Sequence, residues 1–244
     1  MFTYIRDFNL IQLKNIPVYS KLISLFVLLF VVMASGCNNG SSEEKTTTAQ
    51  KPAARVEEKK PAMKTILFFG NSLTAGYGLQ PSQAFPALIQ QKIDSLQLPY
   101  KVINAGLSGE TSAGGKNRID WILKQPVDIF VLELGANDGL RGISPASTQA
   151  NLQAIIDKVK AKYPDVKIIL AGMEIPPSMG GVYAAQFRVI FRQLAEKNKL
   201  AFIPFLLEGV AGERSLNQGD GVHPTAAGQR ILAENTWVIL KDVL

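Results

Sequence analysis

Between residues 62 and 244, hydrophobic positions gather into short continuous runs separated by longer stretches of mixed polarity. A continuous apolar run closed by polar or glycine residues is typical of a strand that is buried on both faces. The expected strands are Lys64–Gly70, Lys101–Asn104, Val127–Leu134, Lys167–Ala171 and a short fifth one at Ala201–Ile203.

The stretches between these runs have the periodicity of helices. In one of them Leu152, Ile155, Ile156 and Val159 recur at i, i+3, i+4 and i+7, which places them on one face. The expected helices are Gln83–Leu96, Thr111–Lys124, Pro145–Lys162, Ala184–Asn198 and Thr225–Leu240. Alternating strands and helices predict an α/β fold, a parallel sheet of about five strands covered by helices on both faces.

The first residues of the chain have a different pattern. Residues 22–33 are twelve apolar residues in a row, preceded by Arg6, Lys14 and Lys21. A bilayer core needs about 20 apolar residues, whereas the apolar region of a secretory signal needs roughly 7–15. A buried helix is the alternative, but no polar face accompanies the run. The pattern favours an export signal.

The apolar run ends in Ala34-Ser35-Gly36-Cys37, which resembles the lipobox of bacterial lipoproteins, although Ala34 stands where Leu is usual. The resemblance implies a signal peptide over residues 1–36 and a lipidated Cys37 that anchors the protein in a membrane of the cell envelope, facing the periplasm or exterior. The alternative is an ordinary signal peptide beside a free thiol. Residues 38–61 contain no Leu, Ile or aromatic residue, so residues 37–61 are expected to be a linker and residues 62–244 the single domain.

Composition and charge reduce the range of functions that the protein can have. The single Cys excludes a disulfide within the chain. The net charge is +6, but 8 basic and 5 acidic residues lie before position 62, so the domain carries 18 basic and 15 acidic residues, or +3. This excess is too small to indicate a nucleic-acid partner.

Ligands of open parallel sheets bind at the carboxyl ends of the strands. Three glycine-rich turns and the only histidine follow or face those ends, in residues 70–79, 105–111, 135–142 and 219–224. The sequence therefore predicts a site formed by these four loops.

Ser72 in the first loop could be a nucleophile, a helix cap or part of a phosphate-binding turn. No Walker A or dinucleotide-binding glycine pattern is present, which disfavours a nucleotide. Asp220 lies three residues before His223, with Gly221 between them, so its carboxylate can reach Nδ1 and leave Nε2 to take a proton. A lone histidine without cysteine or histidine partners does not indicate a metal, and no cofactor is expected.

A serine with an Asp–His pair suggests acyl transfer, in which a negative charge develops on the substrate oxygen. The N–H groups of Ser72 and Gly109 and the side-chain amide of Asn137 could stabilise that charge. Gly109 could equally be a turn glycine, and Asn137 a turn-forming residue.

Together, the four loops resemble the blocks of the SGNH hydrolases, also called GDSL esterases/lipases. They most resemble the bacterial thioesterase I/protease I/arylesterase/lysophospholipase group. The blocks are Gly70-Asn71-Ser72-Leu73, Gly109, Gly135-Ala136-Asn137-Asp138 and Asp220-Gly221-Val222-His223. The resemblance implies a flavodoxin-like three-layer sandwich and metal-independent hydrolysis of esters or thioesters. It also implies Ser72, Asp220 and His223 as the triad, with Ser72, Gly109 and Asn137 as oxyanion donors.

One position departs from that pattern, because the Asp that commonly precedes the serine is Asn71 here. A catalytically silent binding domain is therefore one alternative, and a carbohydrate O-acetylesterase of the envelope is another. In the resembling group the segment after the fourth strand lines the acyl pocket, which points to Met173, Glu174, Ile175 and Pro176. Residues 173–183 could form a hinged lid or a rigid loop. The expected substrates are small-molecule or lipid esters, and nothing in the sequence indicates the oligomeric state.

Overall fold

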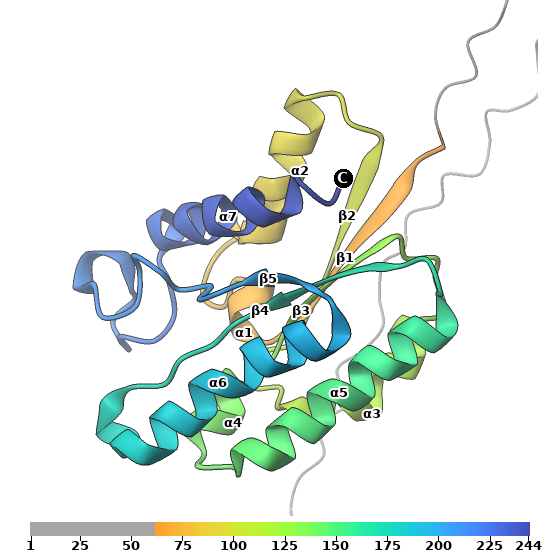
Figure 1. The fold of residues 1–244 in the computed structure, drawn as a ribbon. Helices are drawn as coiled ribbons and strands as arrows, with labels where there is room; N and C mark the ends of the chain where they lie inside the picture. The colour runs from red at the N-terminus through yellow and green to blue at the C-terminus, as the bar shows by residue number, and fades with distance from the viewer. Residues whose placement is uncertain (1–61) are drawn as a thin grey trace, which may run out of the picture. The chain divides into compact units, whose positions relative to one another are not determined.

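The computed structural model describes residues 62–244, which form a five-stranded parallel sheet between two layers of helices (Figure 1). The strand order is β2-β1-β3-β4-β5, and every neighbouring pair is parallel. The strands are β1 (Lys64–Gly70), β2 (Tyr100–Gly106), β3 (Ile129–Glu133), β4 (Lys167–Ala171) and β5 (Ala201–Ile203). This order is that of flavodoxin-like sheets, in which the order of strand addition reverses between β1 and β3.

Helices cover both faces of the sheet. Helices α2 and α7 lie together on one face, and α3, α5 and α6 lie together on the other (Figure 1). The helices are α1 (Ser72–Ala75), α2 (Phe85–Ser95), α3 (Ser112–Ile122), α4 (Ala136–Leu140), α5 (Pro145–Lys162), α6 (Gly181–Asn198) and α7 (Ala226–Leu240). Three short 3₁₀ turns are Pro81–Gln83, Pro177–Met179 and Arg214–Leu216. The expected three-layer α/β fold is confirmed.

The core lies between the sheet and the helices on each face. Phe68 and Phe69 are adjacent on β1 and point to opposite faces, and both are completely buried. Phe68 packs against Phe85 of α2, whereas Phe69 packs against Phe130 of β3. The continuous apolar runs of the sequence are therefore explained by burial on both faces.

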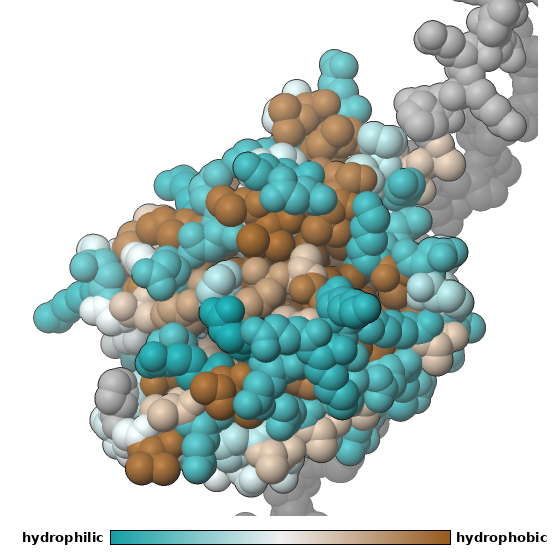
Figure 2. Space-filling model, in the orientation of Figure 1, coloured by the Kyte–Doolittle hydropathy of each residue, from teal (hydrophilic) through white to brown (hydrophobic). Residues whose placement is uncertain are grey.

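One face of the domain carries separate polar and hydrophobic areas. Figure 2 shows a largely hydrophilic surface over α5 and α6, with hydrophobic residues gathered between α6 and α7 around the edge strand β5. Within residues 62–244, no helix combines the length and the hydropathy needed to cross a membrane. The expected signal peptide, Cys37 and the linker lie outside the described residues.

Candidate active site

Ser72 lies at the start of α1, two residues after the end of β1. Asn71 has a non-helical backbone and caps this helix, because its Oδ1 accepts a hydrogen bond from the Leu73 amide at 2.9 Å. The helix ends after four residues at Gly76, whose φ of 73° is in the left-handed region that glycine favours. This tight turn holds Ser72 at the carboxyl edge of the sheet, with 9% of its surface exposed.

His223 approaches Ser72 from the loop before α7. Its Nε2 lies 3.0 Å from Ser72 Oγ, and its Nδ1 lies 2.6 Å from Asp220 Oδ2. Asp220 Oδ1 accepts hydrogen bonds from the backbone amides of Val222 at 2.9 Å and His223 at 3.0 Å. The structure thus brings the three expected triad residues into one hydrogen-bonded series of hydroxyl, imidazole and carboxylate.

The charge of Asp220 is stabilised by the turn that it caps. The backbone amide of His223, then its imidazole, then the amide of Val222 hold the pKa of Asp220 well below its usual range. An ionised carboxylate beside Nδ1 favours the tautomer that carries the hydrogen there. Nε2 is then free to accept the proton of Ser72.

Tyr77 lies against the imidazole, a contact that no pattern in the sequence predicted. The centroids of the Tyr77 and His223 rings are 4.5 Å apart, with the rings tilted by 40°. Gln218 connects the same two segments, because its side-chain amide donates to the Tyr77 carbonyl and its backbone amide donates to the His223 carbonyl, each at 2.7 Å. The turn after Ser72 and the His223 loop therefore hold each other in place.

The two other expected oxyanion donors lie on neighbouring loops. The Leu107 amide donates to the Gly70 carbonyl at 2.8 Å, which fixes the β2–α3 loop beside the end of β1. Asn137, at the start of α4, donates through Nδ2 to the Glu110 carbonyl at 3.0 Å. The structure therefore brings Gly109 and Asn137 to the same edge of the sheet.

Both groups keep an N–H that could meet a substrate oxygen. Gly109 is exposed with a φ of 81°, and no hydrogen bond within residues 62–244 uses its amide. Its carbonyl accepts a hydrogen bond from Arg141 at 3.1 Å, which holds the peptide in place. Asn137 uses one amide hydrogen on the Glu110 carbonyl and retains the other.

Asp138 lies fully buried behind this loop and joins three helices. It accepts hydrogen bonds from the backbone amide of Ser112 at 2.8 Å, from the Ser112 hydroxyl, and from Thr148 Oγ1 at 3.3 Å. Asn151 of α5 in turn donates to Ser112 Oγ at 3.2 Å. The sequence placed Asp138 in a motif but gave no sign of this anchoring role.

Glu133 is a second buried acid that the sequence analysis missed, since it sits at the end of an apolar strand. It is 1% exposed, and burial raises the pKa of its carboxyl group to about 7. Four hydrogen-bond donors surround it, two from Asn71 and two from Thr74. The turn that carries Ser72 is therefore built against this carboxylate.

The four residues expected to line an acyl pocket follow β4 and differ in their surroundings. Met173 and Ile175 are buried in the hydrophobic core, and Pro176 is exposed. Glu174 pairs with Arg188 of α6 at 3.0 Å. Their assignment to the acyl pocket stays a prediction, because core packing explains the two apolar side chains equally well.

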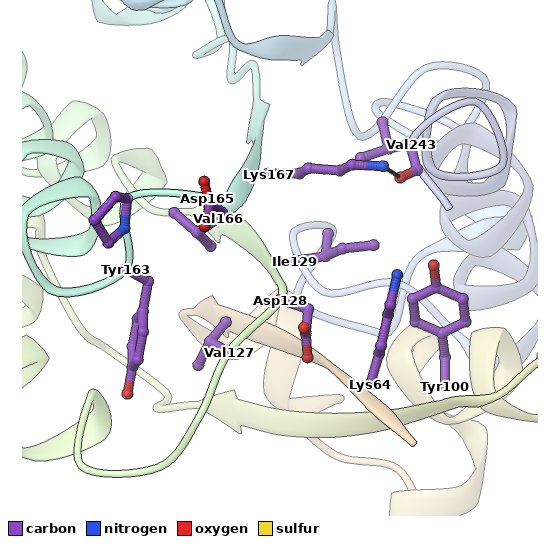
Figure 3. Close-up of a pocket in the computed structure, with 11 residues that line it drawn as sticks. Lys64, Tyr100, Val127, Asp128, Ile129, Tyr163, Asp165, Val166, Lys167 and Val243 are labelled. Atoms are coloured by element: carbon purple, nitrogen blue, oxygen red, sulfur yellow. Dashed lines mark hydrogen bonds between the residues drawn. The ribbon is translucent and has the colours of Figure 1, made fainter. Parts of the chain in front are cut away.

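Two surface cavities lie at opposite ends of the strands. One of about 340 Å³ opens at the amino ends of β1, β3 and β4, where Lys64 lies beside Tyr100, and Lys167 binds the Val243 carbonyl (Figure 3). It lies at the edge of the sheet opposite to Ser72. The other, of about 460 Å³, is lined by residues of the His223 loop, including Asp220. Only the second adjoins the triad residues.

The fold and this edge of the sheet define a class of protein. A hydroxyl, an imidazole and a carboxylate in series, beside free N–H donors, form the arrangement with which serine hydrolases carry out acyl transfer. Among residues 62–244, no group of three or more His, Cys, Asp or Glu side chains could hold a metal ion.

Comparison with known proteins identifies the family. Residues 68–231 match the model of the GDSL-like lipase/acylhydrolase family, and the chain belongs to this family. It is 40% identical to the esterase TesA of Pseudomonas aeruginosa over 187 residues, which cover 76% of this chain and 92% of that protein. It is 37% identical to the thioesterase 1/protease 1/lysophospholipase L1 of Escherichia coli over 174 residues, covering 71% and 81% of the two chains. A crystal structure of TesA superposes with a TM-score of 0.71 at 41% identity, covering 74% of this chain and 100% of that one.

Proposed function

We propose that this protein hydrolyses carboxylic esters or thioesters through an acyl-enzyme on Ser72. His223 Nε2 takes the Ser72 proton as Oγ attacks the acyl carbon, and then gives that proton to the departing alcohol or thiol. Water, deprotonated by the same nitrogen, attacks the acyl-enzyme and releases the acid, and the proton held by Nε2 returns to Ser72 Oγ. The observation that carries the proposal is the series of distances from Ser72 Oγ to His223 Nε2, 3.0 Å, and from His223 Nδ1 to Asp220 Oδ2, 2.6 Å.

Asp220 stabilises the imidazolium that forms during each proton transfer. Its low pKa, set first by the His223 backbone amide, keeps it ionised at neutral pH. The oxyanion of the tetrahedral intermediate is bound by the N–H groups of Ser72 and Gly109 and by the side-chain amide of Asn137. The free N–H groups of the last two residues support this role.

The surroundings of the site support a substrate with an apolar group. Exposed apolar side chains accompany each of its four loops, namely Tyr77, Leu107, Leu140 and Val222. Isolated exposed hydrophobic residues are common, but one on every loop of a site favours acyl or aryl esters over small polar ones. Lysophospholipids are among the substrates proposed, since the relative from Escherichia coli is named as a lysophospholipase.

The location proposed for this activity is the cell envelope. The apolar run, followed by small residues and Cys37, supports export and attachment by a lipid anchor. Metabolic labelling with an alkyne fatty acid should tag the wild-type protein and leave Cys37→Ser untagged. Labelling that survives this substitution would contradict the anchor.

The two alternatives are less well supported. The relatives described above are named as an esterase and as a thioesterase/protease/lysophospholipase, which does not favour a carbohydrate O-acetylesterase. A silent binding domain would not need the hydrogen-bonded series from Ser72 to Asp220.

The proposal is tested by turnover of p-nitrophenyl esters with acyl chains from acetyl to palmitoyl. Wild-type protein should hydrolyse medium or long chains, and Ser72→Ala should lose about 10⁴-fold or more in kcat with its folding unchanged. Full activity in Ser72→Ala would rule the mechanism out. Faster release of acetate from acetyl-xylan than from any simple ester would favour the sugar enzyme.

A further inference from the structure

The buried carboxylate of Glu133 is not used by the reaction just described. Its Oε2 accepts three hydrogen bonds, from the Asn71 amide at 3.1 Å, the Thr74 amide at 3.3 Å and Thr74 Oγ1 at 2.7 Å. Its Oε1 accepts one, from Asn71 Nδ2 at 2.7 Å. A Cβ at Gly70 would overlap Glu133 and Thr74, so the glycine at the end of β1 is what allows this approach.

The Asn71 side chain connects this carboxylate to Ser72. While Nδ2 donates to Glu133, Oδ1 accepts from the Leu73 amide at 2.9 Å and lies 3.4 Å from Ser72 Oγ. If the amide rotated by 180°, Nδ2 would face the Leu73 N–H and the cap would be lost. Of the two ends of the Asn71 amide, only Nδ2 can donate to the Glu133 carboxylate. Glu133 therefore selects the rotamer in which Oδ1 faces the turn.

We infer that Glu133 is a positioning residue for the nucleophile: it fixes the orientation of the Asn71 amide, which holds the turn that presents Ser72 Oγ to His223. The inference rests on the proposed role of Ser72 as nucleophile. Glu133 itself contacts neither Ser72 Oγ nor His223 among the hydrogen bonds of residues 62–244.

The residue at position 71 is matched to this acid. The Asp that is usual there in the resembling family would set two carboxylates face to face, and one of them would have to keep a proton. Asn71 removes that need, because its Nδ2 offers a hydrogen where a second carboxylate would offer only a lone pair. The ionised form of Glu133 is therefore the form that fits four donors.

The same geometry makes the pair sensitive to pH. The groups that face Glu133 are the backbone and side chain of Asn71 and Thr74, and no charged side chain of the described residues pairs with it. Burial raises the pKa of Glu133 to about 7. Below that pH a proton on Oε1 would meet Asn71 Nδ2, donor against donor, and would favour the rotated amide, in which Oδ1 faces Glu133 and no longer caps α1.

The test moves the carboxylate to position 71 and the amide to position 133. Asn71→Asp, Glu133→Gln and the double variant are compared with the wild type, with kcat expressed per site labelled by a fluorophosphonate. In the double variant the Gln oxygen can take the place of Oε2, and its amide nitrogen can donate to the new Asp.

We expect each single variant to lose about tenfold in kcat at pH 8 and the double variant to return to within about threefold of the wild type, with KM little changed. The pH profile provides a second readout. Asn71→Asp should lose activity as pH rises, because the proton shared by its two carboxylates is then removed, whereas the double variant should not.

Asp128→Asn is the matched control. It also converts a carboxylate that accepts a backbone amide, that of Thr65 at 2.7 Å, but at the opposite edge of the sheet, and it should keep wild-type kcat. Single variants that fail to fold beside a folded, active double variant would support the inference. It is overturned if the singles keep wild-type kcat per site, or if the double variant is no more active than the weaker single or does not fold. Failure of the proposed function is a separate result, seen as Ser72→Ala keeping wild-type activity.

Discussion

Asn137 shows how one residue can be oriented by a bond that leaves part of it free. Its Nδ2 donates to the Glu110 carbonyl at 3.0 Å, which fixes the plane of the amide and directs the second hydrogen. The Glu110 side chain is itself held by Arg118 through Nε at 2.8 Å, which anchors the residue that supplies this acceptor. A donor fixed before the substrate arrives needs no reorganisation when the oxyanion forms.

Asn137→Ala should therefore lower kcat by on the order of 10²–10³, with little change in KM, because this hydrogen bond is made mainly in the transition state. Steady-state kinetics on p-nitrophenyl butyrate measure both constants. Asn117→Ala, on the exposed side of α3, is the control and should behave as the wild type. A rise in KM with kcat unchanged would show that Asn137 binds the substrate without stabilising the oxyanion.

Among single residues, the sequence predicted the site residues that lie in loops with recognisable motifs. Asp220 and His223 are three positions apart, so their pairing follows from local chain geometry, and the structure has it. Glu133 and Tyr77 could not be predicted in the same way. Each depends on a partner that is distant along the chain, Asn71 for one and His223 for the other.

Among the elements, the short helix α4 depends on contacts with its neighbours. It has five residues, too few to be stable alone, and Asp138 fastens it to the first turns of α3 and α5. The anchored helix in turn places Asn137 beside the β2–α3 loop. The position of Asn137, a proposed oxyanion donor, therefore depends on packing between helices.

Asp138→Ala should destabilise the domain by about 3 kcal/mol, because it leaves the buried amide and hydroxyl of Ser112 without their acceptor and removes one of the two acceptors of the Thr148 hydroxyl. Urea denaturation measures the change. The control Asp157→Ala removes an exposed carboxylate of α5 and should change stability by less than about 0.5 kcal/mol. Equal effects of the two substitutions would contradict the anchoring role.

The sequence predicted the boundaries of some elements and missed those of others. β1, β4, β5 and α5 have the boundaries expected from the sequence. β2 is longer than expected because polar Asn104 lies inside it, and α6 begins three residues early, at Gly181. α4 was missed, since residues 135–142 contain three glycines and read as a turn.

Over the whole domain, the site joins the turn after β1 to the loop before α7, and the buried Glu133 lies against that turn. Glu133 has a folded pKa of about 7, raised by burial from the usual 4.5. A raised pKa in a carboxyl group means that the folded state holds its proton more tightly than the unfolded state does. The contribution of Glu133 to the free energy of unfolding is fully present below about pH 4.5 and is lost as pH rises towards 7.

The wild type should therefore lose up to about 3 kcal/mol of unfolding free energy between pH 4.5 and pH 8 through Glu133. Glu133→Gln should lack this slope. Asp220 acts in the opposite sense, but only as pH falls below about 4, because its folded pKa is lowered. Urea unfolding at several pH values compares the two proteins, and identical slopes would contradict the assignment to Glu133.

The proposed reaction requires that folding bring the hydroxyl of Ser72 within reach of the His223 imidazole, so that it reacts as a nucleophile. Treatment with an alkyl fluorophosphonate, followed by mass spectrometry of the digested protein, tests this most directly. If Ser72 is the nucleophile, we expect one adduct per chain on the peptide that contains it and no adduct in Ser72→Ala. If His223 is its base, labelling of His223→Ala should be slowed by at least about 10³-fold. An adduct on a different residue, or wild-type labelling of His223→Ala, would contradict the proposed reaction.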